Sequence, residues 1–346
     1  MLPRERITNA INFKSVDIVP LRIFPAPGGL YEHGQKLVDM IKELGHDFGP
    51  LDSLTMPKGP LPDEFDSDGR YHTIKMDDWG TTWEYRIFGI WGHSIVRPLD
   101  DISKLDQYKP PLFPQPKGEG FEKEKLQAFN HKKNYYLLGE GGSLFEKLHS
   151  LRRFEEVLMD VTLNTKEINH LADVVIENIQ AHISKGLALN VDSFAFGDDF
   201  GTQSSMIFSL KTWRDFFKPR YKNLFKSIKQ AGKKVFFHSC GKIEKLFEDF
   251  KEIGVDVIWP QLPVYDLPEL AKHCRHLNLA IELHPDRGDL MQKASPDAVQ
   301  AYIHNLIDTF DVLSGGSWLY IEIDPGFPWK NVETLVKTAM KLREQV

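Results

Sequence analysis

A histidine and a cysteine two positions apart, His238 and Cys240, are the residues whose types and spacing point most directly to chemistry. They end the apolar run Lys234–Cys240, which is typical of a buried strand. Alternate residues of a strand project to one face, so the imidazole and the thiol should converge. Because imidazole and thiolate are ligands that zinc prefers, the spacing predicts a zinc site. The alternative is a chance pair in which the cysteine is a small core residue.

A catalytic zinc ion commonly has three protein ligands and one open position, so this site needs a third ligand. Acidic residues that close the last apolar run are the first choice, and polar residues on the run before it are the alternatives. The predicted third ligand is Glu322, and the alternatives are Asp324, His284 and Glu282. A salt bridge from Glu322 to Arg22 or Arg287 is the competing interpretation.

Polar residues also follow other apolar runs, where burying them unpaired would cost free energy. Asp198 and Asp199 are adjacent carboxylates that suit a general base or an acceptor for a histidine ligand, with helix capping as the alternative. Glu140, followed by two glycines, is the third catalytic candidate, with an ordinary turn as the alternative. The predicted substrate-binding residues are Arg22, Asp52, Gln203, Gln261 and Arg287, the last as a clamp for a carboxylate.

The elements that must position these residues are short apolar runs alternating with amphipathic stretches, a rhythm typical of parallel βα units. A dinucleotide-binding sheet would need a G-x-G-x-x-G turn after its first strand, and Pro25-Ala-Pro-Gly-Gly is not one. The pattern predicts an α/β fold, a (β/α)8 barrel of the TIM type, whose sites lie at the carboxyl ends of the strands. The predicted strands are Asp17–Phe24, His46–Ser53, Tyr135–Gly139, Val191–Gly197, Lys234–Cys240, Val255–Gln261, Leu279–His284 and Trp318–Asp324. The predicted helices are Gln35–Leu44, Thr212–Gln230, Ile243–Ile253, Leu267–Leu277, Pro296–Phe310 and Val332–Gln345.

Residues 54–133 break this rhythm, because they are rich in proline, glycine, aspartate and aromatic residues. Within them, Arg70–Lys75 and Thr81–Arg86 resemble the arms of a hairpin. The several tryptophans suit packing better than solvation, which argues against a structureless linker between two domains. We therefore expect one domain over residues 1–346, with residues 54–133 inserted after the second strand as a cap on the barrel mouth.

Net charge, cysteine count and hydropathy argue against several classes of partner and of fold. The 43 basic and 49 acidic residues give a net charge of −6, which offers no basic field for nucleic acid. Two cysteines cannot form a disulfide framework, and Cys274, inside a helical pattern, is expected to pack in the core. The sequence starts without a signal peptide and has no apolar stretch that could span a membrane. We expect a soluble, cytoplasmic protein with neither a nucleic-acid nor a membrane partner.

Several segments, taken in order, resemble the uroporphyrinogen decarboxylase superfamily over essentially the whole chain. They are Pro3-Arg-Glu-Arg-Ile with Asp17-Ile-Val-Pro, Asp78-Trp-Gly-Thr-Thr-Trp, Pro98-Leu-Asp-Asp, Gly197-Asp-Asp-Phe-Gly-Thr-Gln, His238-Ser-Cys-Gly and Pro325-Gly-Phe-Pro with Asn331-Val. The resemblance is greater to the corrinoid-dependent methyltransferase branch than to true uroporphyrinogen decarboxylase. It implies a (β/α)8 barrel.

The two branches imply different chemistries. Decarboxylases grip propionates with an arginine-rich N-terminal loop and carry an aspartate after the second strand; here Arg22 stands alone and Asp52 lies near the aspartate's place. Methyltransferases bind zinc through His-x-Cys and a late cysteine; His238 and Cys240 match, whereas Ile321-Glu-Ile-Asp holds only carboxylates.

The resemblance implies a zinc-dependent methyltransferase that moves a methyl group between a small substrate and a corrinoid or other carrier. The sequence has no Asp-x-His-x-x-Gly corrinoid motif, so the corrinoid would be carried by a separate protein. The alternatives are uroporphyrinogen decarboxylase or another metal-free decarboxylase, and a non-catalytic ligand-binding barrel. Members of the superfamily often pair, which makes a homodimer one arrangement for this chain.

Overall fold

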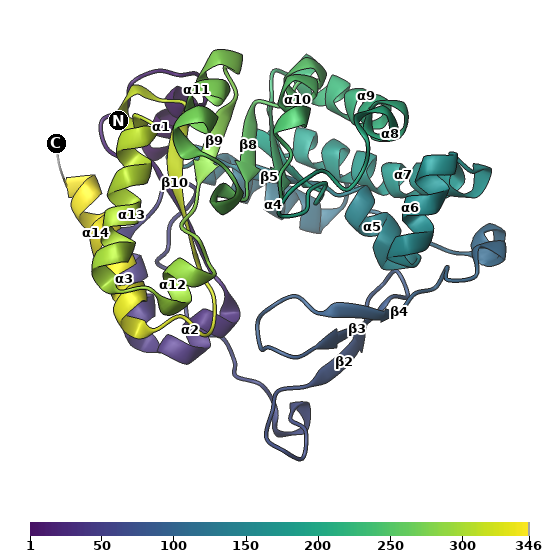
Figure 1. Cartoon of the computed structure of the whole chain (residues 1–346), viewed down its shortest axis with the longest axis horizontal. Helices are drawn as coiled ribbons and strands as arrows, with labels where there is room; N and C mark the ends of the chain where they lie inside the picture. Colours follow the sequence, from purple (N-terminus) through teal and green to yellow (C-terminus); the bar gives the residue numbers. More distant parts are fainter. Residues whose placement is uncertain (345–346) are drawn as a thin grey trace.

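A seven-stranded parallel sheet, curled into an incomplete barrel with helices on its outer side, dominates the computed structural model, which describes residues 1–344 (Figure 1). Seven of the eight predicted strands form, each close to its predicted place, and every neighbouring pair is parallel. In spatial order the strands are β1 (Leu21–Pro25), β10 (Ser317–Ile323), β9 (Ala280–Leu283), β8 (Val257–Pro260), β7 (Lys234–Ser239), β6 (Ser193–Gly197) and β5 (Leu138–Gly142).

The predicted strand over residues 46–53 was wrong, because this segment forms no strand in the structure. Asp47 alone takes its place: its N–H donates to the Leu21 carbonyl at 2.9 Å, and its carbonyl accepts from the Tyr136 N–H at 3.1 Å. Gly49 and Pro50 follow at once, and proline has no N–H to continue a ladder. The sheet is therefore open between β1 and β5, where a closed eight-stranded barrel was expected.

The Asp47 side chain makes a hydrogen bond and two ion pairs at the amino end of this gap. Its carboxylate is fully buried and accepts from the Leu21 N–H at 2.7 Å and from Arg343 Nη1 at 2.9 Å. Arg6 donates to its other oxygen. Arg6 and Arg343 belong to the first and last helices, so one carboxylate joins both ends of the chain to β1.

The predicted helices are confirmed except at two places. The predicted helix over Ile243–Ile253 begins with a 3-10 turn over Glu244–Leu246, and its α-helical part covers Phe247–Ile253. The stretch predicted as a single helix over Thr212–Gln230 contains a wider π-helical turn over Trp213–Phe217, because Pro219 has no N–H to donate to the Asp215 carbonyl. Gln345, the last residue of the final predicted helix, lies outside the described residues. The α-helices are α1 (Pro3–Ile11), α2 (Pro27–His33), α3 (Gln35–Leu44), α4 (Glu119–His131), α5 (Phe145–Leu151), α6 (Phe154–Leu163), α7 (Lys166–Ala188), α8 (Leu210–Thr212), α9 (Lys218–Gln230), α10 (Phe247–Ile253), α11 (Leu267–Leu277), α12 (Asp289–Lys293), α13 (Pro296–Thr309) and α14 (Trp329–Glu344).

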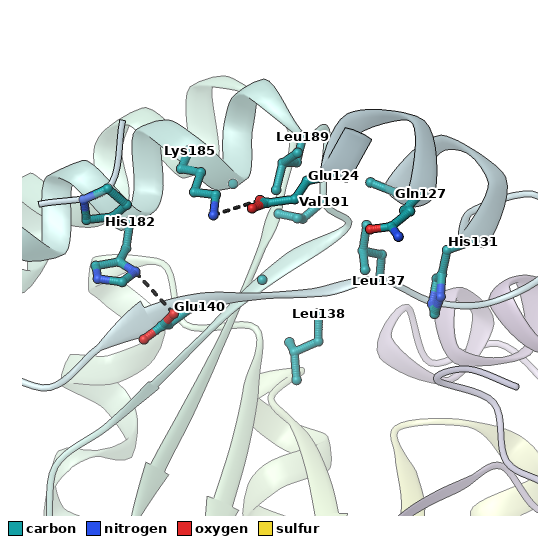
Figure 2. A pocket seen from close by; sticks show the side chains of 14 residues that line it. Glu124, Gln127, His131, Leu137, Leu138, Glu140, His182, Lys185, Leu189 and Val191 are labelled. Atoms are coloured by element: carbon teal, nitrogen blue, oxygen red, sulfur yellow. Dashed lines mark ion pairs between the residues drawn. The ribbon is translucent and has the colours of Figure 1, made fainter. Parts of the chain in front are cut away.

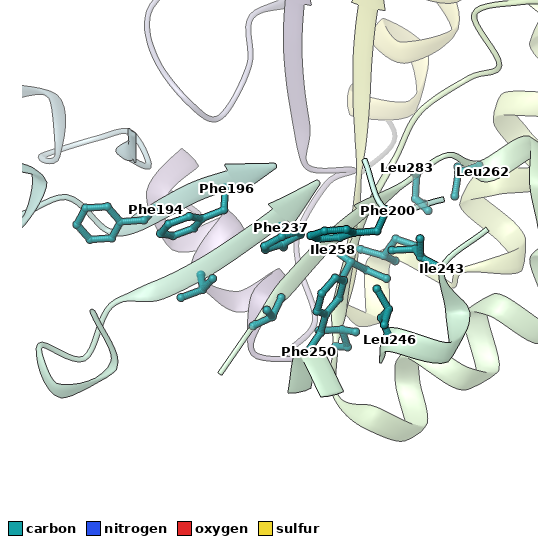
Figure 3. Close-up of a cluster of buried hydrophobic side chains, with 14 of the residues drawn as sticks. Phe194, Phe196, Phe200, Phe237, Ile243, Leu246, Phe250, Ile258, Leu262 and Leu283 are labelled. Carbon is teal, nitrogen blue, oxygen red and sulfur yellow. The ribbon is translucent and has the colours of Figure 1, made fainter. Parts of the chain in front are cut away.

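Aromatic packing fixes the strands that carry the sequence-predicted site. Figure 3 shows Phe237 of β7 beside Phe200 and Phe250, and all three side chains are buried. The ring centroids of Phe237 and Phe250 are 4.7 Å apart, and those of Phe200 and Phe237 are 6.2 Å apart. Because each buried ring contributes both apolar area and a preferred ring geometry, the ends of β6 and β7 are held rigidly.

The insertion contains a small antiparallel sheet of β2 (Thr73–Met76), β3 (Thr82–Tyr85) and β4 (His93–Val96), which confirms the predicted hairpin. The turn after β3 packs on α2, where the Phe88 carbonyl leaves no room for a Cβ on Gly28. Thr81 Oγ1 donates to the Ser150 carbonyl in α5. The small sheet thus contacts the helices that follow β1 and β5 (Figure 1). Among residues 1–344, no helix combines the length and the apolar character needed to cross a bilayer.

Candidate metal centre

Three side chains meet at the carboxyl ends of β6 and β7: Asp199, His238 and Cys240. Their ligand atoms all lie within 4.8 Å of one another. His238 Nε2 is 3.4 Å from Cys240 Sγ and 3.4 Å from Asp199 Oδ1. The convergence of His238 and Cys240 follows from the two-residue period of β7. A nitrogen, a sulfur and a carboxylate oxygen are all ligand types that zinc accepts.

The backbone sets which ring nitrogen of His238 faces the centre. His238 Nδ1 lies 2.8 Å from the Trp259 carbonyl, which can only accept, so Nδ1 carries the proton and Nε2 presents its lone pair to the other two groups. Burial lowers the pKa of His238, although Asp199 opposes the shift. A neutral imidazole with Nε2 free is the form that binds a metal.

The thiol of Cys240 is protonated without a metal. Burial, followed by the carboxylate of Asp199, raises its pKa to about 12. Asp199 Oδ1 also accepts from the Cys240 N–H at 2.7 Å, which ties the two loops together. Since a metal ligand must be a thiolate, binding of a cation here is coupled to release of a proton.

Asp198 has a different structural role from Asp199. Its side chain is fully buried and accepts from the N–H groups of Phe145 and Glu146 at 2.9 Å each. The hydroxyl of Tyr221 donates to the same carboxylate. Asp198 therefore caps the first turn of α5 and holds the loop from which Asp199 reaches the centre, while burial raises its pKa to about 7.

Two glycines let the loops after β6 and β7 touch. A Cβ on Gly241 would lie 2.2 Å from the carbonyl carbon of Gly201, and Gly241 has a φ of +76°. No side chain fits at this approach without moving backbone that flanks Asp199 and Cys240. The close contact fixes the spacing between the ligands.

None of the four residues predicted as third ligands belongs to this group of three, although His284 and Asp324 line a cavity with His238 and Cys240. Glu322 and Asp324 share Arg287, whose Nη1 is 2.8 Å and 3.3 Å from their oxygens. Glu282 is buried and accepts from Arg22 and from Trp318 Nε1. Both ring nitrogens of His284 face backbone carbonyls, at 3.1 Å and 3.0 Å. The structure groups Asp199, which we had expected as a base or a hydrogen-bond partner, with His238 and Cys240.

Glu322 gives a pH-dependent prediction. Burial raises its pKa to about 7 from an ordinary value near 4.5, against the opposing charge of Arg287. Between these values the folded chain binds more protons than the unfolded chain, so the free energy of unfolding falls as pH rises. Relative to wild type, Glu322→Gln should gain about 1 to 3 kcal/mol between pH 4.5 and 7.5. Urea unfolding at each pH measures this. Glu333→Gln, on the surface of α14, is the control, and a pH-independent difference for Glu322→Gln would contradict the prediction.

A cavity of about 380 Å³ opens beside the centre. His238, Cys240, Arg287 and Asp324 are among the residues that line it. Gln261 also lines it, and its side-chain oxygen accepts from the Gly241 N–H at 3.0 Å. The amide of Gln203 donates to that oxygen at 3.1 Å. Three of the predicted substrate-binding residues, Gln203, Gln261 and Arg287, therefore lie in or next to one cavity.

Glu140, Asp52 and Arg22 do not join the centre. Glu140 lies at the open edge of β5 and pairs with His182 of α7 at 3.1 Å, beside a second cavity of about 400 Å³ (Figure 2). Asp52 is exposed in the loop after α3. Arg22 Nη1 forms an ion pair with Glu282 Oε2 at 3.0 Å. None of these three residues reaches the group of Asp199, His238 and Cys240.

Glu146 is a neighbour of the centre that sequence reasoning missed. Its carboxylate pairs with His149 at 3.0 Å, and its N–H donates to Asp198 Oδ1 at 2.9 Å. Its position in the first turn of the helix after β5 was the available signal, because such a turn lies at the carboxyl end of the sheet. Glu146 thus contacts Asp198, the residue before Asp199.

A family model described as uroporphyrinogen decarboxylase (URO-D) matches residues 93–342. The chain belongs to this family. The resemblance found in the sequence is confirmed, and the open barrel is a variant of the TIM-type barrel of uroporphyrinogen decarboxylase family members. None of the curated proteins compared with the sequence matches it.

Among solved structures, a methyltransferase from Methanosarcina mazei has the same fold over its whole length. It superposes with a TM-score of 0.62 at 13% identity, covering 99% of each chain. A dihydropteroate synthase from Xanthomonas albilineans matches more weakly, with a TM-score of 0.38 at 12% identity over 57% of this chain and 65% of its own.

Proposed function

We propose that this chain is a zinc-dependent methyltransferase of the uroporphyrinogen decarboxylase family, acting between a small substrate and a corrinoid or other carrier. The observation that carries the proposal is the convergence of Asp199, His238 and Cys240 beside a cavity of substrate size. Three protein ligands of types N, S and O leave a fourth position open, which is the pattern of catalytic rather than structural zinc. The whole-length likeness to a methyltransferase fold is consistent with this choice.

The residues of the chain would hold and orient both the ion and the substrate. A bound zinc ion supplies Lewis acidity, which activates a heteroatom that gains or loses a methyl group. The Trp259 carbonyl orients His238, the Cys240 N–H orients Asp199, and Asp198 anchors the loop between them. Residues 54–133 serve as the cap of a single domain and exclude water, which their contacts with α2 and α5 support. The free thiols of both cysteines suit a reducing cytoplasm.

Metal-free decarboxylation of a porphyrinogen fits the site less well. Its several carboxylates would need unpaired cations, yet Arg22 is bound to Glu282 and Arg287 to Glu322 and Asp324. Asp52, the stand-in for the decarboxylase aspartate, is exposed. A polyanion would therefore have to compete with three existing ion pairs.

Methyl transfer from methylcobalamin to a small thiol tests the proposal directly. Zinc-loaded wild type should accelerate demethylation of methylcobalamin, which is measured as the loss of its absorbance. The His238→Ala variant should not accelerate this reaction. Uroporphyrinogen is offered to the same preparations. Decarboxylation that survives removal of the metal would overturn the proposal, and metal binding without turnover of any donor would favour a ligand-binding barrel.

A further inference from the structure

Two neighbouring cavities at the amino ends of the strands are lined mainly by cations. The larger, of about 390 Å³, lies between α4 and the loop before β6, and no acidic residue is among the described residues that line it. Its lining residues are Arg4, Lys125, Phe129, Lys132, Lys133, Ala188, Leu189 and Asn190. The smaller, of about 220 Å³, shares Arg4 and adds Lys233, Lys234 and one carboxylate, Asp192. Four cations in the larger cavity and two more in the smaller therefore stand against one carboxylate, in a chain whose net charge is −6.

That single carboxylate cannot neutralise the cations of the larger cavity. Arg4 Nη2 and Lys132 Nζ both pair with Asp192 Oδ1, at 2.8 Å and 3.0 Å. The other two cations, Lys125 and Lys133, form no ion pair within residues 1–344, and Lys133 Nζ donates only to an uncharged amide oxygen. One anion is thus shared by two cations while two more have none, which leaves the cavity with an excess of positive charge.

Asn190 holds two of the lysines at the edge of these cavities. Its carbonyl accepts from Lys132 Nζ, and its side-chain oxygen accepts from Lys233 Nζ. Both acceptors are uncharged, so they orient the ammonium groups without cancelling their charge. Burial lowers the pKa of Lys233, and the nearby charges of Lys132 and Arg4 lower it further. The cations are therefore close enough to repel one another, and a bound anion would relieve this repulsion.

The donors that remain suit several anionic oxygens at once. An ammonium group has three N–H donors, so Lys133 keeps two and Lys125 keeps all three among the described residues. Arg4 uses Nε and Nη2 on Asp192, which leaves Nη1 for a ligand. A single carboxylate could meet only part of this set, whereas a chain of phosphates carries several charges on adjacent groups. A cavity of this volume also suits a small molecule.

We infer that the larger cavity binds a di- or triphosphate group, either free or carried by a nucleotide. The site is separate from the proposed metal centre, which lies at the opposite ends of the same strands. Phe129 distinguishes the two sources of the phosphate group. Its side chain is 65% exposed and lines the cavity, so it offers a surface on which a nucleotide base would stack.

Calorimetric titration of the full chain with tripolyphosphate and with ATP, at low ionic strength and without added divalent cations, tests the inference. Wild type should bind at least one of these probes at one per chain, and more weakly as sodium chloride is added. Replacing both Lys125 and Lys133 with glutamine should weaken binding by about tenfold or more. The matched control replaces Lys42 and Lys330, exposed lysines of α3 and α14, with glutamine and should bind as wild type does.

The outcomes separate this inference from the proposed function. His238→Ala should bind the probes as wild type does, because it alters only the metal centre. Weaker binding of ATP alone in Phe129→Leu would identify a nucleotide, and equal affinity of wild type for both probes would identify the phosphate group itself. No binding of either probe to wild type would overturn the inference. Full binding by the double lysine variant, or loss of binding in His238→Ala, would also overturn it. Circular dichroism checks that each variant is folded.

Discussion

Replacing Cys240 or His238 with alanine is expected to abolish stoichiometric zinc binding. Wild-type protein, prepared without chelators, should contain one zinc per chain by mass spectrometry of the metal. Each substitution removes one of three ligands that converge within 4.8 Å, and should weaken zinc affinity by about a hundredfold or more. Competition with a chromophoric chelator measures the affinity. Methyl transfer should fall with it.

The matched substitutions decide which third ligand is used. Asp199→Ala should lose zinc as Cys240→Ala does, whereas Glu322→Gln should retain it, because Glu322 is paired with Arg287. Cys274→Ser controls for loss of a thiol, since Cys274 is buried in α11 away from the centre. Wild-type protein without zinc would refute the metal hypothesis. Retention in Asp199→Ala with loss in Glu322→Gln would move the third ligand back to β10.

The sequence was informative about this centre only where a strand dictates direction. His238 and Cys240 share a face because side chains alternate along β7. Asp199 lies in a loop whose path depends on Asp198 capping α5 and on Gly201 touching Gly241. Neither contact has a local sequence signature, so the sequence identified Asp199 as a candidate catalytic residue but not as a neighbour of His238 and Cys240. Glu322 has the right direction on β10, yet a longer-range ion pair holds it.

The fold, like the candidate centre, could be predicted only in part, because the sequence pattern reports which segments form strands but not every contact between them. The inner strands β7, β8, β9 and β10 are almost wholly buried, and burial on both faces leaves a continuous apolar pattern. The eighth run, residues 46–53, contains Asp47, Gly49 and Pro50, and its weak pattern matched its failure to pair. What the pattern could not reveal is that Asp47 replaces a strand by bonding to both edges of the gap. The consequence is an open barrel in which one charged residue bridges the gap between β1 and the segment before β5.

This bridging role predicts a large loss of stability in Asp47→Asn. The variant keeps the size and the backbone bonds of Asp47. It leaves Arg343, whose side chain is 14% exposed, facing a neutral amide, and Arg6, whose side chain is 7% exposed, with Asp17 as its remaining carboxylate partner. Removing one partner of a buried ion cluster costs about 3 to 5 kcal/mol, because the remaining charges stay buried. Urea unfolding followed by far-ultraviolet circular dichroism should show this as a lower midpoint.

The control for this prediction is Asp289→Asn, which breaks an exposed pair with Lys293 and should leave the midpoint unchanged. If packing alone bridged the gap, the unfolding midpoint of Asp47→Asn would be close to that of wild type. That outcome would assign the bridging role to the aromatic rings of Phe48 and Tyr136, whose centroids are 5.6 Å apart. Asp47→Asn with Arg343→Met distinguishes the two, because removing a stranded cation should restore part of the loss only if charge bridges the gap.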